Sequence, residues 1–450
     1  MHSLTKQLLV KEQTRKIPAT SLSRLWCLGN SHAKIAAYFL NYAIRKNFLA
    51  GDKRQEAFNQ AKTKAALQLF GTMGYLRGAV MKVGQLIANL PQITDRELVE
   101  IFESLQFEAP PMHYSLIREV FLDELGQEPE ELFAHFERRA FAAASIGQVH
   151  RARLHDGTEV AVKIQYPDIA RTIESDLKTL GMLLRTMRLK EDFKILQSHI
   201  TDARQVFLQE VDYLVEADYM EKNRRIFQDT DIVVPRAFPE FSNRKVLTME
   251  LLPGVHLQQF LAGKPSQEKR NHFGERISRA FIHSFFHCRT IYADLHPGNF
   301  IFMGDGRLGF IDFGCFQQFS PERWRFQMES EQAMYTQNRE GLLQFFARVA
   351  LVDSADQLDP ELIESMSRQV SWIISPILSE GPFDFADKRY VEEGVQLFKE
   401  LLKKGSLTRT DCFYNWSNRA LLGHRGIMYR LQCKFDYSSI YFNEMRQVMS

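Results

Sequence analysis

The chain has 450 residues, of which 45% are hydrophobic and 25% are charged. This composition is ordinary for a globular protein and excludes the collagen-like, low-complexity and intrinsically disordered classes. The length exceeds the size at which one hydrophobic core usually stops growing, so we expect two packed units with extensions.

The net charge of +2 conceals a basic start, because the first fifty residues carry eight lysines and arginines against the single acid Glu12. Such a segment is typical of a solvated terminus, of a contact with anionic lipid or of an organelle-targeting sequence, and the residues leave these interpretations open. No apolar run approaches the roughly 18 residues of a membrane span, so no transmembrane helix is predicted. The five cysteines form no CxxC pair, which indicates a reducing compartment and no zinc site.

The first quarter of the chain is predicted to be helical. From residue 31 to residue 91, apolar residues recur at spacings of three and four, which is the period of an amphipathic helix. Prolines then punctuate two further helices, one around residues 95–106 and one over residues 114–125. These helices precede a part of the chain with a different pattern.

That next part begins with a predicted β-hairpin. Residues 141–154 and 159–165 contain alternating β-formers, and Asp156-Gly157 between them is a hairpin-turn signal. A long charged segment with helical periodicity follows, over residues 167–227. A small β unit with one long helix is therefore expected here.

The second half is mainly helical after two short strands near residues 232–234 and 245–249. One exception is a second hairpin, residues 299–311, which turns at Gly304-Asp305-Gly306. The chain thus has helices first, then a small β unit with one long helix, and then a helical unit with one hairpin. This order predicts a two-lobed α+β protein.

Four residues match the needs of phosphoryl transfer, which requires a cation on the nucleotide phosphates, ligands for Mg²⁺ and a group that orients the nucleophile. Lys163 ends the strand sequence Val-Ala-Val-Lys and would hold the phosphates. Asp294, followed five positions later by Asn299, has the spacing of a kinase catalytic loop, and Asp312 opens Asp-Phe-Gly. Asp294 would orient the acceptor, while Asn299 and Asp312 would bind Mg²⁺. A solvated lysine or a Pro-Gly turn explains each motif alone, but their joint order favours an ATP site.

A phosphate-binding loop is expected ahead of Lys163, where the sequence reads Ala142-Ala143-Ala144-Ser145. Alanines stand where glycines are usual in such a loop. Because alanine reaches positive φ less readily than glycine, we expect a stiffer loop whose amides approach phosphate in a different geometry. A small-residue strand that packs closely is the alternative interpretation.

At these residues the sequence resembles the UbiB/AarF family of atypical kinases, which is associated with ubiquinone and isoprenoid-lipid metabolism. The resemblance runs from about Leu76 to Phe319. It rests on a Lys-x-Gly-Gln motif at Lys82, the alanine-rich loop, a Glu-x-Asp motif at Glu210, and the catalytic-loop string followed by Asp-Phe-Gly. It implies a protein-kinase-like fold with an N-terminal helical extension, and Mg-ATP as the ligand.

The resemblance also implies roles for residues outside the catalytic motifs. Lys82 and Gln85 are three residues apart and share one helix face; in the family this helix lies across the nucleotide cleft, where it would disfavour protein phosphorylation. Glu210 and Asp212 would face that helix and partner Lys82 or a metal ion. Without the resemblance, a solvated helix face explains all four residues.

Two further assignments concern the nucleotide itself. Glu216 is our choice for the acid that pairs with Lys163, with Glu210 as the alternative. At the junction of the two lobes, backbone groups of Glu250 and Leu252 are expected to hydrogen-bond an adenine edge while Met249 packs behind it. A strand that ends at a Pro-Gly turn is the plain alternative for this segment.

The sequence departs from protein kinases at several points. Tyr292 and Ala293 replace the His and Arg of the usual catalytic loop, so other contacts must hold this loop. No Ala-Pro-Glu sequence follows Gly314, so the peptide-substrate platform is expected to be absent. The last thirty residues mix basic and aromatic side chains, so any membrane association is expected to be peripheral.

The sequence therefore predicts an ATP- and Mg²⁺-dependent atypical kinase or ATPase that acts in or regulates isoprenoid-lipid metabolism. Expected parts are a helical extension (1–110), an N-lobe (111–250) and a helical C-lobe (251–450). The partner would be a lipid-pathway component or a membrane-associated complex, with no nucleic acid. A cytoplasmic location is expected, with peripheral membrane contact and organelle targeting left open. The alternatives are a small-molecule kinase of the choline or aminoglycoside type and a nucleotide-responsive binding module without turnover.

Overall fold

The computed structural model describes residues 34, 37, 41–42, 112–144, 146–167, 169–170, 204, 208–292, 295–403 and 412–449. The chain consists of two compact units. The first contains residues 1–116, 139–149 and 165–207, and the second contains residues 117–138, 150–164 and 208–450. The expected helices before residue 110 lie outside the described residues, apart from four helical positions between 34 and 42.

In the first unit, the alanine-rich segment forms a short β-hairpin. Strand β2 (Ala142–Ala144) pairs antiparallel with the start of β3 (Gly147–Arg153), in the register Ala144 to Gly147. Two residues connect the strands, and Ile146, the second of them, is buried and accepts a hydrogen bond from the Tyr166 amide at 3.0 Å. The segment is therefore strand on both sides of a tight turn.

The second unit begins with a small antiparallel sheet, in the order β1-β3-β4-β6. Its strands are β1 (His135–Phe136), β3, β4 (Glu159–Gln165) and β6 (Val246–Glu250). Helices α6 (Tyr114–Leu125) and α7 (Pro129–Leu132) precede it, and α10 (Tyr213–Ile226) and η3 (Pro239–Phe241) precede β6. The predicted helix over residues 114–125 and the hairpin at Asp156-Gly157 are both confirmed.

The remaining strands form three small sheets. Their orders are β5-β9-β8, β10-β7 and β11-β12. The strands are β5 (Ile232–Val233), β7 (Thr290–Tyr292), β8 (Phe300–Phe302), β9 (Leu308–Phe310), β10 (Phe316–Gln318), β11 (Phe383–Asp384) and β12 (Lys434–Phe435). The pair β8 and β9 is the hairpin predicted around Gly304-Asp305-Gly306, and Gly306 adopts a φ of 89°, which favours glycine.

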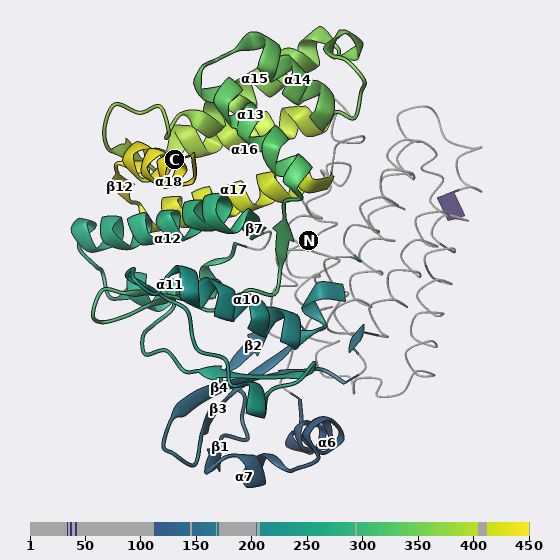
Figure 1. Cartoon of the computed structure of the whole chain (residues 1–450), viewed down its shortest axis with the longest axis vertical. Helices are drawn as coiled ribbons and strands as arrows, with labels where there is room; N and C mark the ends of the chain where they lie inside the picture. Colours follow the sequence, from purple (N-terminus) through teal and green to yellow (C-terminus); the bar gives the residue numbers. More distant parts are fainter. Residues whose placement is uncertain are drawn as a thin grey trace. The chain divides into compact units, whose positions relative to one another are not determined.

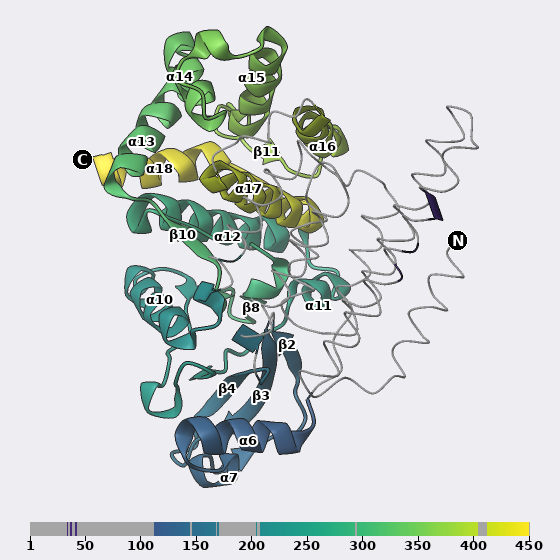
Figure 2. The ribbon, with the colours of Figure 1, turned by 90° about the vertical axis from the view of Figure 1, so that its right-hand side faces the viewer.

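Helices make up most of the second unit after residue 256. They are α11 (Leu257–Ala262), α12 (Gln267–Cys288), η4 (Pro297–Asn299), α13 (Pro321–Tyr335), α14 (Arg339–Val349), η5 (Ala355–Gln357), α15 (Pro360–Ile374), α16 (Lys388–Lys403), α17 (Cys412–Leu431) and α18 (Tyr437–Met449). Figures 1 and 2 show α12, α17 and α18 lying side by side. A core centred on Phe346, Met366 and Ile374 joins α14 to α15. Mixed helices and sheets confirm the predicted α+β class.

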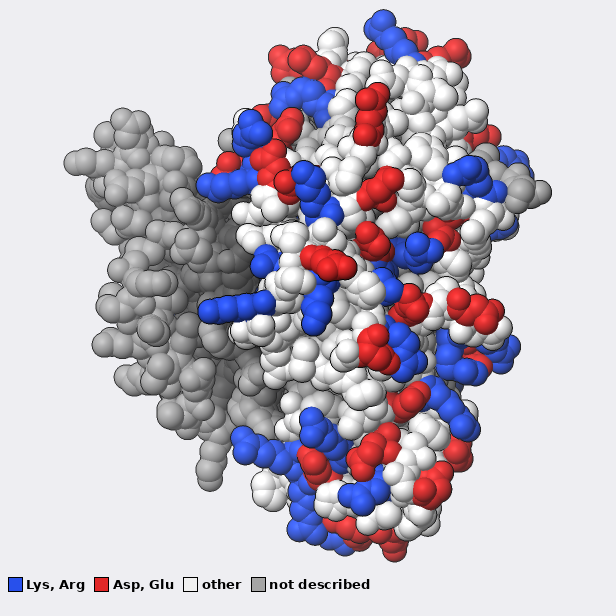
Figure 3. Space-filling view, turned by 90° about the vertical axis from the view of Figure 1, so that its left-hand side faces the viewer, with Lys and Arg blue, Asp and Glu red and all other residues white. Residues whose placement is uncertain are grey.

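One face of the described part carries charged side chains of both signs. In Figure 3, lysine and arginine side chains alternate with aspartate and glutamate over the face turned to the viewer. Within the described residues, no helix is long and apolar enough to cross a membrane.

Candidate active site

Lys163 is buried in the middle of the N-terminal sheet. Strand β4 lies between β3 and β6, and its side chains are buried from Val160 to Gln165. Side chains of a strand point alternately to the two faces of the sheet, and both faces are covered here, so neither set of side chains is exposed. Only 7% of the Lys163 side chain is accessible. A buried ammonium requires compensating charge, and the structure supplies it.

Two carboxylates face the Lys163 ammonium. Lys163 Nζ donates to Glu216 Oε1 at 2.7 Å and to Oε2 at 2.9 Å, and Asp312 Oδ2 lies 3.8 Å away. Burial alone would lower the pKa of Lys163, but Asp312 and Glu216 outweigh it and raise this pKa above its ordinary value. The lysine is therefore charged, and Glu216, the acid chosen from the sequence, is its partner.

Sequence reasoning missed Tyr213, the first residue of α10. Its ring lies 5.2 Å from Lys163 Nζ, a cation–π distance. The side chain is buried, which raises the pKa of its hydroxyl, and this hydroxyl has no hydrogen-bond partner among the described residues. The only signal in the sequence was its position directly after the Glu-x-Asp motif. It places an unused donor beside the lysine and its acids.

The two acids of the Glu-x-Asp motif have different surroundings. Asp212 is the N-cap of α10: its Oδ1 accepts from the Leu214 amide at 3.1 Å, and its Oδ2 lies 3.4 Å from Arg244 Nε. Glu210 is buried and close enough to raise the pKa of Tyr213 by its charge, after the larger effect of burial. Asp212 thus caps the start of α10. Of the two acids of the motif, Glu210 is the buried one and lies near Tyr213. Lys82 and Gln85, their expected partners, lie outside the described residues.

The β8–β9 hairpin brings the two predicted metal ligands to one end. Asn299 ends η4 immediately before β8, and its carbonyl accepts from the Ile311 amide at 3.0 Å. Ile311 is the neighbour of Asp312, so this bond fixes the two candidate ligands side by side at the open end of the hairpin. Asp312 Oδ1 accepts from the Gly314 amide at 3.0 Å, while 38% of its side chain stays accessible. Hard oxygen donors in this arrangement fit Mg²⁺.

The catalytic-loop region is held by contacts that protein kinases do not use at these positions. The Tyr292 hydroxyl donates to Asn223 Oδ1 at 2.8 Å, and Asn223 belongs to α10, the helix that carries Glu216. The Tyr292 ring packs edge-on against Phe313 of the Asp-Phe-Gly motif at 5.6 Å. Tyr292 therefore links the strand before the catalytic loop both to α10 and to the Asp312 segment. Asp294 itself lies outside the described residues.

The rest of this loop is packed against α17. His296 Nδ1 accepts from the Gly298 amide at 3.0 Å, so His296 stabilises the turn of this loop. A Cβ atom added to Gly423 of α17 would lie 2.6 Å from the Leu295 carbonyl oxygen. Only glycine permits this approach of a helix to the loop backbone.

The segment between the lobes passes close to β8. Met249 and Leu252 are buried, and Gly254 has a φ of 151°. A Cβ at Gly254 would lie 2.7 Å from the Phe302 carbonyl oxygen, which explains the glycine. The Glu250 amide donates to the Arg236 carbonyl at 2.9 Å. Hydrogen bonds from Glu250 and Leu252 to an adenine edge stay a prediction.

The alanine-rich hairpin belongs to the first unit. Ala143 is exposed and its two alanine neighbours are half-buried, whereas Ser145 lies outside the described residues. The structure thus describes Ala142, Ala143 and Ala144 as a strand, not as an open loop. Their role as a phosphate cover stays a prediction.

One other group of described residues has metal-ligand chemistry. His283 and His287 of α12 and Glu444 of α18 have ligand atoms within 4.8 Å of one another. His283 Nδ1 and Glu444 Oε2 are already hydrogen-bonded at 2.6 Å, and Arg279 lies 4.0 Å from the other carboxylate oxygen. Glu444 thus already has a hydrogen-bond partner and a nearby arginine, and the group joins α12 to α18.

Comparisons with known proteins agree with this geometry. Residues 104–346 match a family model described as an ABC1 atypical kinase-like domain. The chain is 31% identical over 343 residues to the mitochondrial atypical kinase COQ8B of Rattus norvegicus, covering 75% of this chain and 64% of that protein. It is 26% identical over 380 residues to the mitochondrial atypical kinase COQ8 of Schizosaccharomyces pombe, covering 83% of this chain and 61% of that protein.

A solved structure is also similar. It is a Mycobacterium tuberculosis protein in complex with erythromycin, with a TM-score of 0.58 and 26% identity, and the match covers 88% of this chain and 100% of that one. The chain spans less than two thirds of the length of the two mitochondrial relatives.

Proposed function

The chain belongs to the ABC1 atypical kinase-like family, and from this premise we propose that it binds Mg-ATP and acts as an atypical kinase or ATPase. This family membership confirms the UbiB/AarF resemblance found in the motifs. Lys163 would hold the nucleotide phosphates, and Asn299 and Asp312 would bind Mg²⁺. Asp294 would orient the group that attacks the terminal phosphate.

One observation carries the proposal: a buried, charged lysine flanked by Glu216 at 2.7 Å and Asp312 at 3.8 Å. Glu216 fixes the position of the ammonium through two hydrogen bonds, and the Asp312 side chain stays 38% accessible. A lysine held in this way presents a fixed positive charge to phosphate oxygens. Magnesium, when bound, would neutralise charge that develops on the phosphates.

Other residues would support the lysine, the catalytic loop, the adenine and the phosphates. Tyr213 places a hydroxyl donor beside the lysine. The hydrogen bond from Tyr292 to Asn223 holds α10 against the strand that leads into the catalytic loop. The carbonyl of Glu250 and the backbone of Leu252 would bind the adenine edge. Ala142, Ala143, Ala144 and Ser145 would cover the phosphates, with Lys82 and Gln85 restraining access for protein substrates.

The catalytic proposal is tested with Asp294→Asn. If Asp294 orients the nucleophile, the variant should bind ATP with unchanged affinity and lose at least about 100-fold in turnover, a typical size for a general base. Asp305→Asn is a matched control, because Asp305 is a surface aspartate of the β8–β9 turn that pairs with Arg307. Turnover by Asp294→Asn at the rate of Asp305→Asn would rule the mechanism out.

We further propose that the partner is a component of isoprenoid-lipid, ubiquinone-like metabolism at a membrane surface. This rests on the family resemblance and on the basic first fifty residues; relatives named mitochondrial support the organelle-targeting interpretation of that segment. Phosphate release should be measured with and without anionic liposomes and isoprenoid-like phenols. Stimulation by both additives supports this role, whereas equal rates in every condition would contradict it.

A further inference from the structure

A cavity of about 160 Å³ lies among the helices of the second unit. Its walls come from α12, α13, α14, α15, α17 and α18, the helices grouped in the upper half of Figure 1. Most of the lining is apolar, with Phe281, Phe285, Phe345, Val370 and Ile374 among its side chains. A dry apolar cavity of about 150 Å³ is large enough to take up benzene. We call it the C-lobe cavity; none of its lining residues is Lys163, Glu216, Asp312 or Asn299.

The charged residues that line this cavity favour an anion. They are Arg323, Arg348, Arg425 and Glu331. Both oxygens of Glu331 are already engaged, because Oε1 accepts from Gln327 at 2.8 Å and Oε2 accepts from Tyr335 and from Tyr441, each at 2.6 Å. Arg348 is also paired with Glu322, at 3.7 Å. The lining thus carries three guanidinium groups and one hydrogen-bonded carboxylate, an excess of positive charge.

Arg425 is the unusual member of this set. It is 4% exposed, and its Nε and Nη1 atoms have no hydrogen-bond partner among the described residues. Its Nη2 donates only a long hydrogen bond, 3.4 Å, to the Ile373 carbonyl. The rings of Tyr437 and Phe385 lie 4.6 and 5.3 Å from the guanidinium carbon. Ring faces attract a cation, but they do not satisfy its N–H donors. Burial raises the pKa of the Tyr437 and Tyr390 hydroxyls and the nearby Arg425 opposes this, yet neither hydroxyl is aligned to accept from Nε or Nη1.

A second orphan donor lines the same cavity. Asn418 is also 4% exposed, and its Nδ2 atom has no hydrogen-bond partner among the described residues. Asn418 and Arg425 both belong to α17, seven positions apart, so they project from one side of that helix. A buried cation without a carboxylate partner is costly, and so is a buried amide donor without an aligned acceptor. An anionic group bound between Arg425 and Asn418 would compensate both.

We propose that the C-lobe cavity binds a small apolar carboxylate, with its carboxylate on Arg425 and Asn418 and its ring or chain among the aromatic and aliphatic side chains. The volume limits the apolar body to about six to eight carbons, since a benzene-sized cavity holds no more. Benzoate and octanoate represent the two body shapes that satisfy these limits.

The first test uses the full chain and matched ligands. Benzoate, benzyl alcohol and benzylamine have similar size but are anionic, neutral and cationic, respectively, at neutral pH. Octanoate, octanol and octylamine form the same series with a flexible chain in place of the ring. Ligand binding to the folded state raises Tm, so the carboxylates should give the largest Tm shift and the amines the smallest. Equal or larger shifts from the amines would overturn the proposal, and so would the absence of any shift from both carboxylates.

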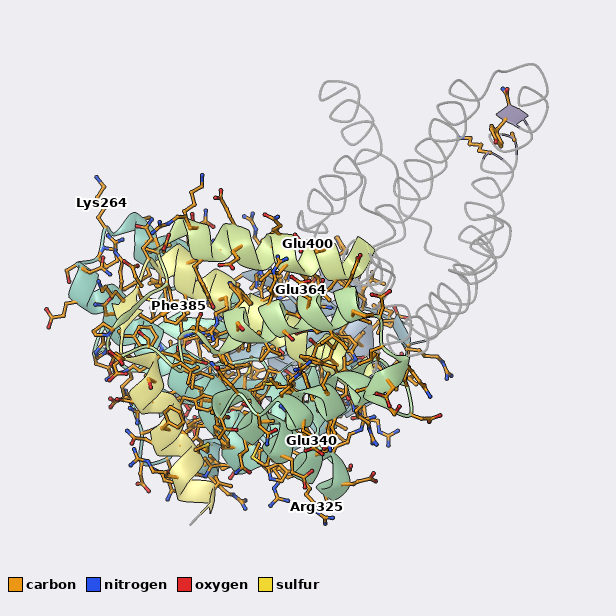
Figure 4. The ribbon with its side chains drawn as sticks, turned by 90° about the horizontal axis from the view of Figure 1, so that it is seen from above. Lys264, Arg325, Glu340, Glu364, Phe385 and Glu400 are labelled. Atoms are coloured by element: carbon orange, nitrogen blue, oxygen red, sulfur yellow. The ribbon has the colours of Figure 1, made fainter. Side chains whose placement is uncertain are left out.

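The second test uses variants. Arg425→Gln should weaken carboxylate binding about tenfold or more, the expected loss for a charge-assisted hydrogen bond, while benzyl alcohol binds as before. Arg325→Gln is the control, because Arg325 lies on α13 at the outer edge of the helices, whereas Phe385, the neighbour of Arg425, lies inside them (Figure 4). Carboxylate affinity unchanged in Arg425→Gln would contradict the assignment.

Two further measurements test the position of the ligand without relying on the folding of Arg425→Gln. They also distinguish the C-lobe cavity from the nucleotide site. Val370→Phe fills the cavity, so it should abolish binding of carboxylate and alcohol together. Saturating Mg-ADP should leave benzoate binding to the unmodified chain unchanged. Displacement of benzoate by Mg-ADP, or full binding by Val370→Phe, would place the ligand elsewhere and overturn the proposal.

Discussion

Two buried cations of this chain are stabilised in opposite ways. Lys163, with 7% of its side chain accessible, has two carboxylates within 3.8 Å. Arg425, 4% exposed, has two aromatic rings and no hydrogen-bond partner at two of its three nitrogens among the described residues. A buried charge is stable only when its partner is present. The lysine therefore belongs to a preorganised site, and the arginine to a site completed by an anionic ligand.

The two regions are connected through α17. This helix carries Arg425 and Asn418 at the C-lobe cavity, and its Gly423 packs against the Leu295 carbonyl of the catalytic loop. Variants at Lys163, Arg425 or Gly423 should distinguish stabilisation by a buried acid from stabilisation by a bound anion. The largest effect is expected at Lys163 and the smallest at Arg425.

Lys163→Met should have the largest effect on stability. It leaves Glu216, whose side chain is 2% accessible, buried without its partner, and an uncompensated buried charge costs about 3–5 kcal/mol of unfolding free energy. Urea unfolding measures this loss. The double variant Lys163→Met/Glu216→Leu should recover most of the stability but not ATP binding. A single variant that loses less than about 1 kcal/mol would show that the pair is not a coupled buried unit.

Gly423→Ala should disturb both regions. The new Cβ would lie 2.6 Å from a backbone oxygen, so the helix or the loop must move, at a cost of about 1–3 kcal/mol. We expect a lower Tm and slower ATP turnover. Gly426→Ala on the same helix meets nothing within 4 Å, so it should be neutral or stabilising by up to about 1 kcal/mol. Identical behaviour of the two variants would remove the proposed contact between α17 and the loop.

His424 should make stability depend on pH. It is fully buried, its Nε2 lies 2.8 Å from the Ser278 hydroxyl, and burial, with the Arg425 charge, lowers its pKa well below the usual value. The folded state then binds fewer protons than the unfolded state, so stability falls as pH drops below about 6.5, by at most about 1.4 kcal/mol per pH unit. Unfolding free energies between pH 5 and 8 should show this slope and lose it in His424→Gln.

Arg425→Gln should change the ligand-free stability least, and in the opposite direction to Lys163→Met. Removing a buried charge that lacks a carboxylate partner is expected to be neutral or to stabilise by about 1 kcal/mol. The unfolding free energy without ligand measures this. A loss as large as that of Lys163→Met would show that the guanidinium is already fully compensated in the free protein.

Much of the candidate nucleotide site was predictable because its residues come in local motifs. The hairpin at Gly304-Asp305-Gly306 places Asn299 near Asp312 through pairing of adjacent segments, so spacing along the chain already predicts their proximity. The sequence left Glu210 as an alternative to Glu216 for the acid beside Lys163, and the structure shows the pair with Glu216.

The alanine-rich segment shows the limit of such patterns. Its composition was compatible with a phosphate loop or with a strand, and the described residues are strand. Tyr213 gave no chemical signal of its own; its importance comes from burial beside Lys163. Burial depends on which helix covers the sheet, and no local spacing encodes that.

The sequence alone determined the family, the α+β class and the candidate charged groups of the proposed nucleotide site, since motif residues keep their chemistry wherever the motif occurs. Only the tertiary structure decided how each buried charge is compensated. Tyr292 meets Asn223 across 69 positions of the chain, and Arg425 meets aromatic rings in place of an acid. These pairings follow from how helices remote in sequence pack together, and packing is a property of the whole fold.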